Sequence, residues 1–256
     1  MNAVVAEPSP ASRFIAVAVT HYRRRYVTVL VIDEGVRGRS LRQNDFSQLT
    51  DTYSGDMTTK ILILHDSNSG NTERMALQVA RGVERVEGAE AFLRCTPPVG
   101  ALDAPRVDAV PQAGAPYATL ADLANCDGLV LGSPTHFGNM TASMKHFIDG
   151  TTSCWLAGTL AGKPAAVFTS TGSMHGGQEA TLLTMMVPLL HHGMLIVGLP
   201  YSNPGLMQTS RGGTPYGASH VSGETGDAPL ASVEETLCRA LGKRVATLAD
   251  RLAASA

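Results

Sequence analysis

Short apolar runs alternate with longer segments of helical spacing from Lys60 to the end of the chain. The apolar runs predict strands at 61–65, 91–94, 127–133, 165–170 and 194–197. Segments with apolar residues three or four positions apart predict helices at 72–86, 120–125, 142–151, 179–191 and 233–254. Pro188 marks a kink or an earlier end in the fourth helix. The stretches 96–118 and 202–227 are rich in glycine and proline and predict loops.

The predicted strands are mostly apolar on both faces, which is typical of a parallel sheet covered by helices on both sides. Five strands that alternate with helices predict an α/β fold with a doubly wound five-stranded parallel sheet. Ligands of such sheets bind at the carboxyl ends of the strands, where the strand order reverses. The loops after the first, third and fourth strands are therefore the places to search for a site.

Residues 1–56 differ from the rest of the chain in charge and in pattern. They carry a net charge of +1, whereas residues 57–256 carry −3. Within them, 14–19 and 26–32 each predict a strand. The region is a targeting arm or docking hairpin, or it is a weakly ordered extension. The remaining interpretation is that the start codon is assigned too early and that Met57 is the true first residue. We predict one domain, residues 57–256, preceded by an N-terminal extension.

The composition excludes several classes of function. Apolar residues make up 44% of the chain and charged residues 16%, which indicates a globular protein. A net charge of −2 argues against nucleic-acid binding, and no apolar run has the roughly 18 residues of a membrane span. Four cysteines without a CxxC pair fit neither a zinc site nor a dense disulfide scaffold. With no signal-peptide pattern, they predict a cytoplasmic protein without a metal.

The loop after the first strand has the composition of an anion cradle. It brings hydroxyls, a glycine and backbone amides to the start of a helix, in the residues Ser67, Asn68, Ser69, Gly70, Asn71 and Thr72. Amides and the helix dipole hold a phosphate at such a place without Lys or Arg. An ordinary capped helix start, with Asn71 or Thr72 as N-cap, is the alternative interpretation.

The loops after the third and fourth strands contain residues that suit a planar ring. Phe137 is able to stack on a ring, and Gly138 permits a close approach of the backbone; a proline turn with a buried Phe is the alternative. The later loop again offers hydroxyls and glycines, and its His175 is either a ligand contact or solvated. His191 is either a ligand contact or a partner of the helix dipole. The three loops together suit flavin mononucleotide (FMN) better than ATP, because the chain lacks a Gly-Lys-Ser/Thr element.

Five ordered motifs between about residues 59 and 252 resemble the WrbA-type NAD(P)H:quinone oxidoreductases of the flavodoxin-like family. These motifs are the segments 67–72, 132–140 (GSPTHFGNM), 170–172 with 176–179, 191–194 (HHGM) and 211–218 (RGGTPYGA). The resemblance implies a flavodoxin-like fold with FMN as cofactor and NADH or NADPH as electron donor. It also implies a quinone substrate and a homotetramer in which neighbouring chains contribute to each site.

The resemblance assigns roles to individual residues. The FMN phosphate lies on 67–72, and the ring lies against Thr135, His136, Phe137, Gly138 and Asn139. Seven residues close over the ribityl chain and ring: Ser170, Thr171, Gly172, Ser173, Met174, His175 and Gly176. His191 contacts FMN, and Trp155 lies at the substrate pocket unless it is a core residue. Relatives often have an aromatic residue at Ser69 and an Arg at His136, and they have no counterpart of residues 1–56.

The implied activity is the two-electron reduction of a quinone to a quinol by ping-pong hydride transfer through FMN. The flavin supplies this chemistry, so we predict no catalytic side chain. One alternative is a flavodoxin-like carrier of single electrons, against which the modest negative charge after Met57 argues. The other alternative is a protein-binding scaffold module.

Overall fold

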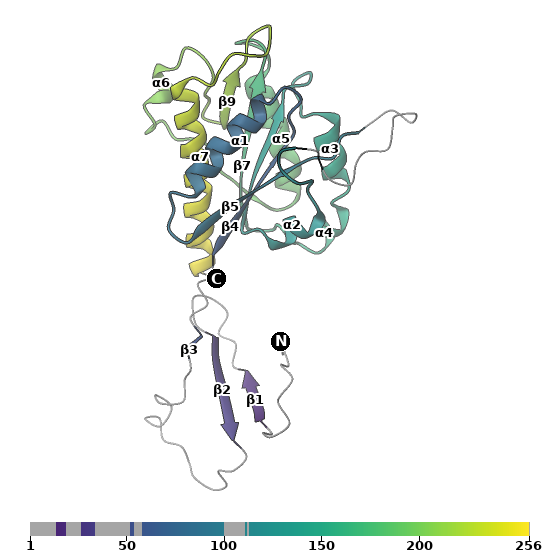
Figure 1. Ribbon diagram of the computed structural model, residues 1–256, viewed down its shortest axis with the longest axis vertical. Helices are drawn as coiled ribbons and strands as arrows, with labels where there is room; N and C mark the ends of the chain where they lie inside the picture. Colours follow the sequence, from purple (N-terminus) through teal and green to yellow (C-terminus); the bar gives the residue numbers. More distant parts are fainter. Residues whose placement is uncertain are drawn as a thin grey trace. The chain divides into compact units, whose positions relative to one another are not determined.

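The computed structural model describes residues 58–99, 111 and 113–255, and three strands before them (Figure 1). The chain divides into two compact units, Met1–Met57 with Ala254–Ala256, and Thr58–Ala253. In the first unit, β1 (Phe14–Ala18), β2 (Val27–Asp33) and β3 (Thr52–Tyr53) form an antiparallel sheet in that order. β1 lies within the predicted range 14–19, and β2 overlaps the predicted range 26–32 and ends one residue later. Apart from these three strands, residues 1–57 lie outside the described residues.

The second unit is built on a parallel sheet with the strand order β5-β4-β6-β7-β8, and β9 pairs with the end of β7. The strands are β4 (Thr59–His65), β5 (Ala89–Cys95), β6 (Gly128–Pro134), β7 (Pro164–Thr171), β8 (Leu195–Ile196) and β9 (Ala218–Val221). The first strand of this unit lies between the second and the third, so the strand order reverses at β4 and β6. The predicted doubly wound parallel sheet is confirmed, with β9 as an additional strand.

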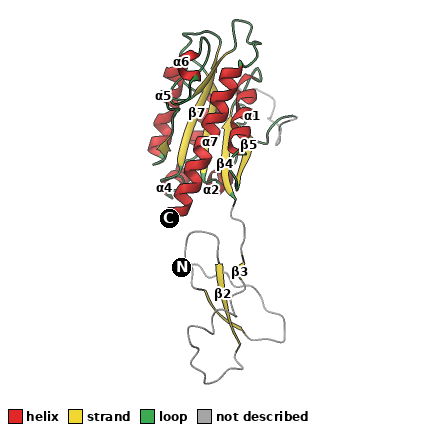
Figure 2. Cartoon of the chain, turned by 90° about the vertical axis from the view of Figure 1, so that its left-hand side faces the viewer, coloured by secondary structure: helices red, strands yellow, loops and turns green. Residues whose placement is uncertain are grey.

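Helices cover both faces of this sheet (Figures 1 and 2). The helices are α1 (Asn71–Val83), α2 (Leu120–Asn125), α3 (Ala142–Asp149), α4 (Thr152–Leu156), α5 (Gln178–His191), α6 (Gly205–Gln208) and α7 (Ser232–Ser255). Side chains of α1 and α7 pack with Ile61 and Ile63 of β4, whereas side chains of α3 to α5 pack with Leu62 and Leu64. This alternation along one strand explains why both faces of β4 are apolar.

The structure corrects the prediction of an uninterrupted loop at 202–227, because that stretch contains α6 and β9. β9 has no apolar pattern: its central residues Ser219 and His220 are polar and completely buried. Their partners are side chains far away in the sequence, which no local pattern reveals. The early end at Pro188 is wrong, since α5 continues past this residue to His191.

Candidate functional site

The loops after β4, β6 and β7 start from one edge of the sheet, because these strands are parallel neighbours (Figure 1). The N–H of Thr135 donates to the carbonyl of Ser170 at 2.9 Å, which joins the loops after β6 and β7. Gly177 lies so close to Gly138 that an added Cβ would be 3.5 Å from the Gly138 Cα. The structure thus brings the predicted loops together at the point where the strand order reverses.

The loop after β4 presents unused hydrogen-bond donors at the start of α1. Gly70, with φ of 80°, is the N-cap, and it provides no side-chain cap. The interpretation with Asn71 or Thr72 as N-cap is therefore wrong. Within the described residues, the backbone N–H groups of 68–72 make no hydrogen bond, and the buried hydroxyl of Thr72 has no partner. This arrangement leaves a positive field and free donors for an anion.

Asp66 connects this loop to the loop after β6. One of its carboxylate oxygens accepts from the N–H of Ser67 at 3.0 Å, and the other accepts from the Thr141 hydroxyl at 2.5 Å. The N–H of Thr141 in turn donates to the Ser133 hydroxyl at 3.0 Å. Sequence reasoning missed this network, because Asp66 and Thr141 lie 75 positions apart.

A tight turn presents Phe137 to solvent. His136 and Asn139 exchange backbone hydrogen bonds of 2.8 and 3.1 Å across Phe137 and Gly138, both of which have positive φ. The Phe137 ring is fully exposed, so the interpretation of a buried Phe in a proline turn is wrong. A left-handed aromatic residue costs about 1–3 kcal/mol of backbone strain, and such strain persists mainly at functional sites. The hydroxyl of Thr184 holds the turn by donating to the Gly138 carbonyl at 3.0 Å.

The loop after β7 is closed on itself and exposes its side chains. The Thr171 hydroxyl and the Gly176 N–H both donate to the carbonyl of Ser173, at 2.9 and 3.1 Å. The residues between, which include Met174 and His175, are exposed. The structure thus places Ser170 and Thr171 in the sheet and leaves 172–175 free to cover a ligand.

A segment that the sequence analysis did not identify also reaches this edge. The Ser222 N–H, just after β9, donates to the Thr171 carbonyl at 2.8 Å. The Asn71 side-chain amide donates to the Gly226 carbonyl at 2.7 Å and to the Ser69 hydroxyl at 3.1 Å. The residues after β9 therefore form a further wall beside the loop after β4.

Comparisons with known proteins agree with this geometry. Residues 59–204 match the model of the family described as NADPH-dependent FMN reductase. A NAD(P)H dehydrogenase (quinone) from Geotalea uraniireducens is 41% identical over 203 residues, which are 76% of this chain and 99% of the relative. This chain belongs to the NADPH-dependent FMN reductase family. The resemblance to WrbA-type NAD(P)H:quinone oxidoreductases is confirmed with it.

Two further comparisons cover the same part of this FMN reductase family member. The NAD(P)H dehydrogenase (quinone) of Geotalea daltonii is 41% identical over 204 residues, or 75% of this chain and 98% of the relative. The crystal structure of a flavodoxin, WrbA-like protein from Agrobacterium tumefaciens has a TM-score of 0.54 at 22% identity. It covers 76% of this chain and 99% of its own, and it shows the flavodoxin-like fold.

Two predicted site residues of this FMN reductase family member do not join the loops. α5 begins at the loop edge and has 14 residues, so His191 at its far end lies about 20 Å away. Trp155 belongs to α4, and the Thr151 hydroxyl before α4 lies 2.9 Å from Nε2 of His192. Trp155 is half exposed and is not a core residue. Both residues therefore lie at the amino edge of the sheet, opposite the loops.

Apolar side chains are exposed around these two residues. They are Leu156 in α4, Val187 and Leu190 in α5, and Leu195 in β8. Burial lowers the pKa of His192, and the neighbouring His191 lowers it further, so this ring is more readily neutral. We call the exposed residues Trp155, Leu156, Val187, Leu190, His191 and Leu195 the amino-edge patch.

Burial favours the neutral forms of one histidine, His65, and of two thiols, Cys95 and Cys126. Burial lowers the pKa of His65 at the end of β4, against the opposite effect of the Glu73 and Asp66 carboxylates. Burial also raises the pKa of the Cys95 thiol, and it raises that of Cys126 to about 11. These two thiols are therefore protonated at neutral pH and are poor nucleophiles.

Proposed function

We propose that this chain is an FMN-dependent NAD(P)H:quinone oxidoreductase that reduces quinones to quinols by two electrons. The observation that carries the proposal is the set of unused donors at the start of α1, beside an exposed aromatic turn. The family match and relatives named NAD(P)H dehydrogenase (quinone) support the same activity.

The residues of the loop after β4 fit the phosphate of FMN. The amides of 68–72 and the Thr72 hydroxyl offer donors without an internal acceptor, which is the chemistry that a phosphate dianion requires. A Cβ added at Gly70 would meet no atom within 4 Å, so the space in front of the loop is open. We assign the phosphate to Ser67, Asn68, Ser69, Gly70, Asn71 and Thr72.

The loops after β6 and β7 fit the rest of the cofactor. We assign the ring to the turn that includes Thr135, His136, Phe137, Gly138 and Asn139, because its backbone and aromatic face are exposed. We assign the ribityl chain and the ring edge to residues 170–176. FMN held by these residues would supply the two-electron chemistry that couples oxidation of NAD(P)H to reduction of a quinone. The protein residues bind and orient it, and none of them serves as a nucleophile.

The amino-edge patch supports a homotetramer. Trp155 and His191 lie opposite the loops of their own chain, so contact of either residue with FMN or quinone requires a second copy. Exposed Leu156, Val187 and Leu190 provide apolar area of the kind that subunit interfaces bury. We therefore propose that each site is completed by the amino-edge patch of a neighbouring chain.

The described residues also support a cytoplasmic protein. None of their helices combines the length and the apolar character that a membrane crossing requires. The four cysteines are free thiols, three of them buried, which suits a reducing compartment.

The experiment is a measurement of FMN content together with NADH–benzoquinone turnover in the purified full-length protein. The proposal predicts about one FMN per chain, bleaching of the flavin absorbance by NADH and recovery of the absorbance when benzoquinone is added. A bound flavin that NADH fails to bleach would favour a carrier of single electrons. A colourless protein without NADH oxidation would favour a scaffold module.

A further inference from the structure

The segment 222–228, which follows β9, touches two loops of the proposed FMN site. At its start, Ser222 hydrogen-bonds the carbonyl of Thr171, the last residue of β7, from which the covering loop starts, through both its N–H (2.8 Å) and its hydroxyl (3.0 Å). Further along, its Gly226 carbonyl accepts from the Asn71 side chain at 2.7 Å. The segment thus bridges the loop that covers the flavin and the loop that binds the phosphate.

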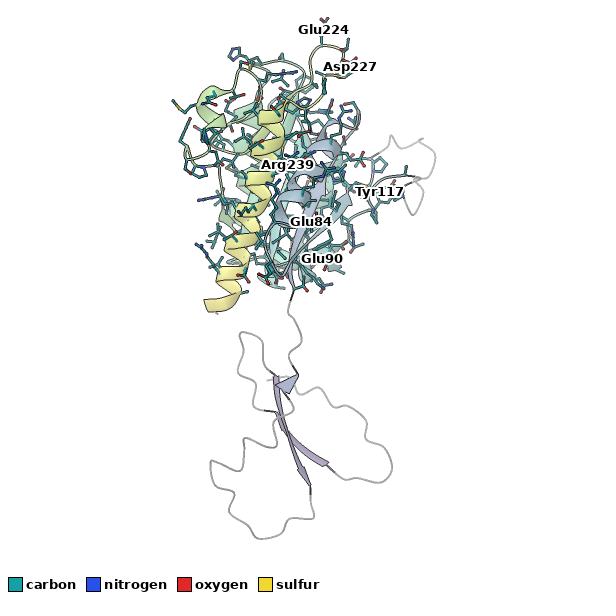
Figure 3. All side chains as sticks on the ribbon, turned by 60° about the vertical axis from the view of Figure 1, so that its left-hand side comes forward. Glu84, Glu90, Tyr117, Glu224, Asp227 and Arg239 are labelled. Atoms are coloured by element: carbon teal, nitrogen blue, oxygen red, sulfur yellow. The ribbon has the colours of Figure 1, made fainter. Side chains whose placement is uncertain are left out.

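The segment has no helix or strand of its own. Its internal backbone hydrogen bonds join the Ala228 N–H to the Ser222 carbonyl at 3.0 Å, and the Gly226 N–H to the Gly223 carbonyl at 3.1 Å. The Thr225 hydroxyl also donates to the Asp227 carboxylate. Its carboxylates Glu224 and Asp227 lie at one end of the second unit, away from Arg239 on α7 (Figure 3). The position of the segment therefore depends on the residues that hold its two ends.

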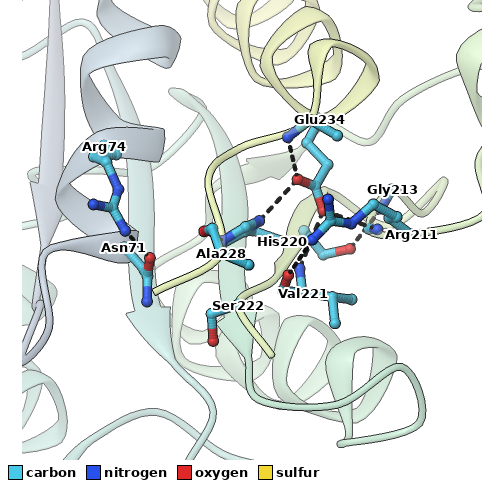
Figure 4. Close-up of polar contacts among 12 residues, drawn as sticks. Asn71, Arg74, Arg211, Gly213, His220, Val221, Ser222, Ala228 and Glu234 are labelled. Carbon is cyan, nitrogen blue, oxygen red and sulfur yellow. Dashed lines mark hydrogen bonds and ion pairs between the residues drawn. The ribbon is translucent and has the colours of Figure 1, made fainter. Parts of the chain in front are cut away.

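A completely buried pair, His220 in β9 and Glu234 in α7, lies directly behind the segment (Figure 4). The Glu234 carboxylate accepts four hydrogen bonds. The donors are the N–H groups of Gly212 (3.0 Å), Val221 (3.1 Å) and Ala231 (2.7 Å), and Nδ1 of His220 (2.8 Å). Burial acts to raise the pKa of Glu234, but the hydrogen bonds outweigh it and hold this pKa below its ordinary value.

The second ring nitrogen of His220 reaches the segment itself. Nε2 lies 3.2 Å from the carbonyl of Ala228, the last residue of the segment. Both ring nitrogens thus face acceptors, the Glu234 carboxylate on one side and the Ala228 carbonyl on the other. One imidazole therefore connects the end of the segment to a carboxylate that is already fixed to three other parts of the backbone.

We propose that His220 is a positioning residue for FMN. Together with Glu234 it fixes the end of the segment 222–228, so that the Gly226 carbonyl stays in place for the Asn71 amide. Asn71 then holds the phosphate loop in the conformation that binds the cofactor. The conformational entropy of the phosphate loop is then lost during folding and not when FMN binds. Because the loop is preorganised in this way, FMN binds more tightly. This inference rests on the proposed function, because it concerns the same cofactor.

Two substitutions separate the two contacts of His220. In His220→Asn, the side-chain amide takes the place of Nδ1, so the hydrogen bond to Glu234 is kept and the one to Ala228 is lost. In His220→Gln, the amide takes the place of Nε2, so the contact with Ala228 is kept and the contact with Glu234 is lost. The readouts are the Kd of FMN for the apo-protein by fluorescence quenching and the thermal midpoint of the same protein.

The two variants are expected to differ in which quantity changes, the Kd of FMN or the thermal midpoint. His220→Asn raises the Kd of FMN about three- to tenfold, since one hydrogen bond of preorganisation is lost, while its thermal midpoint stays near that of the unmodified protein. His220→Gln has a lower thermal midpoint and a nearly unchanged Kd. In His220→Asn, hydrogen exchange of the amides 223–227 is faster, and FMN slows it less than in the unmodified protein. Thr236→Ala, which removes an exposed hydrogen bond within α7, changes none of these quantities.

Other outcomes overturn the inference. An unchanged Kd in His220→Asn would show that the Ala228 contact does not act on the cofactor. If the Kd of FMN rises in both variants in proportion to the fall of their thermal midpoints, the role of His220 is purely structural. An unmodified full-length protein that binds no FMN would contradict the proposed function itself, and the inference with it. Normal FMN binding that neither variant alters contradicts the inference alone.

Discussion

The two edges of the six-stranded sheet carry different kinds of surface. The carboxyl edge carries polar loops with free amides, the unpartnered Thr72 hydroxyl and an aromatic turn held in a strained conformation. The amino edge carries the exposed side chains of Trp155, Leu156 and Leu190. The first surface suits a small anionic cofactor held by one chain, whereas we propose that the second packs against an apolar surface of another copy. Under this proposal, a single chain supplies the residues at the carboxyl edge, and a neighbouring copy supplies Trp155 and His191.

The largest effect is expected at the carboxyl edge. Thr72→Val removes the unpartnered hydroxyl from the phosphate loop at nearly constant volume. Because a hydrogen bond to a charged group is lost, we expect the Kd of FMN to rise about 10- to 100-fold, measured by fluorescence titration of the apo-protein. The apo-protein itself should become slightly more stable, because a buried polar group without a partner is removed.

The control for this substitution is Thr96→Val. Thr96 follows β5 and also has a buried hydroxyl without a partner, but it lies outside the phosphate loop. It should give the same small gain in stability without a change in the Kd of FMN. Equal losses of affinity in both variants would refute the assignment of the phosphate to residues 67–72.

The fold was more predictable than the site. β4, β6 and β7 have apolar residues on both faces, and this pattern can be recognised from consecutive residues of the sequence alone. β9 was missed because Ser219 and His220 are buried through hydrogen bonds to Gln178 and Glu234, which are 41 and 14 positions away. Residues that are buried through such hydrogen bonds do not produce a regular spacing of apolar residues in the sequence.

The loops were predictable from their composition, but their connections were not. The residue types at 67–72 and 136–139 indicate an anion and a ring without knowledge of the fold. The links of Asp66 to Thr141 and of Asn71 to Gly226 depend on where the strands bring these residues. The place of Trp155 at the amino edge follows from chain order, because α4 directly precedes β7.

A smaller effect is expected from pH. Burial lowers the pKa of His65 in the folded state, so the unfolded chain binds the proton more tightly. The stability that the neutral ring contributes is fully present above its ordinary pKa of about 6.5 and is lost as the pH falls toward the lowered value. The free energy of unfolding should therefore decrease below about pH 6.5, with a slope of at most about 1.4 kcal/mol per pH unit for this proton.

Urea unfolding of the full-length protein and of His65→Gln between pH 5 and pH 7.5 measures this difference. The variant should be less stable at pH 7.5, and the difference should shrink as the pH falls. A difference that stays constant would show that His65 does not titrate with folding.

The smallest effect is expected from the N-terminal extension. We propose that residues 57–256 form the complete FMN-binding domain. The described strands β1 to β3 pair only with one another, so deletion of residues 2–56 should leave the Kd of FMN and the NADH–benzoquinone turnover within about twofold. A loss of either quantity in the shortened protein would show that the extension contributes to the site.

The comparison of the two edges is tested most directly by Leu156→Asp. A charge placed in the amino-edge patch should dissociate the assembly, as measured by sedimentation velocity, while the carboxyl edge of each chain is untouched. Leu77→Asp is the control, since Leu77 is also an exposed leucine but lies on α1, on the other face of the sheet. The account predicts that the dissociated Leu156→Asp protein still binds about one FMN per chain but loses at least about tenfold of its quinone turnover. Dissociated chains that bind no FMN, or that keep full turnover, would contradict it.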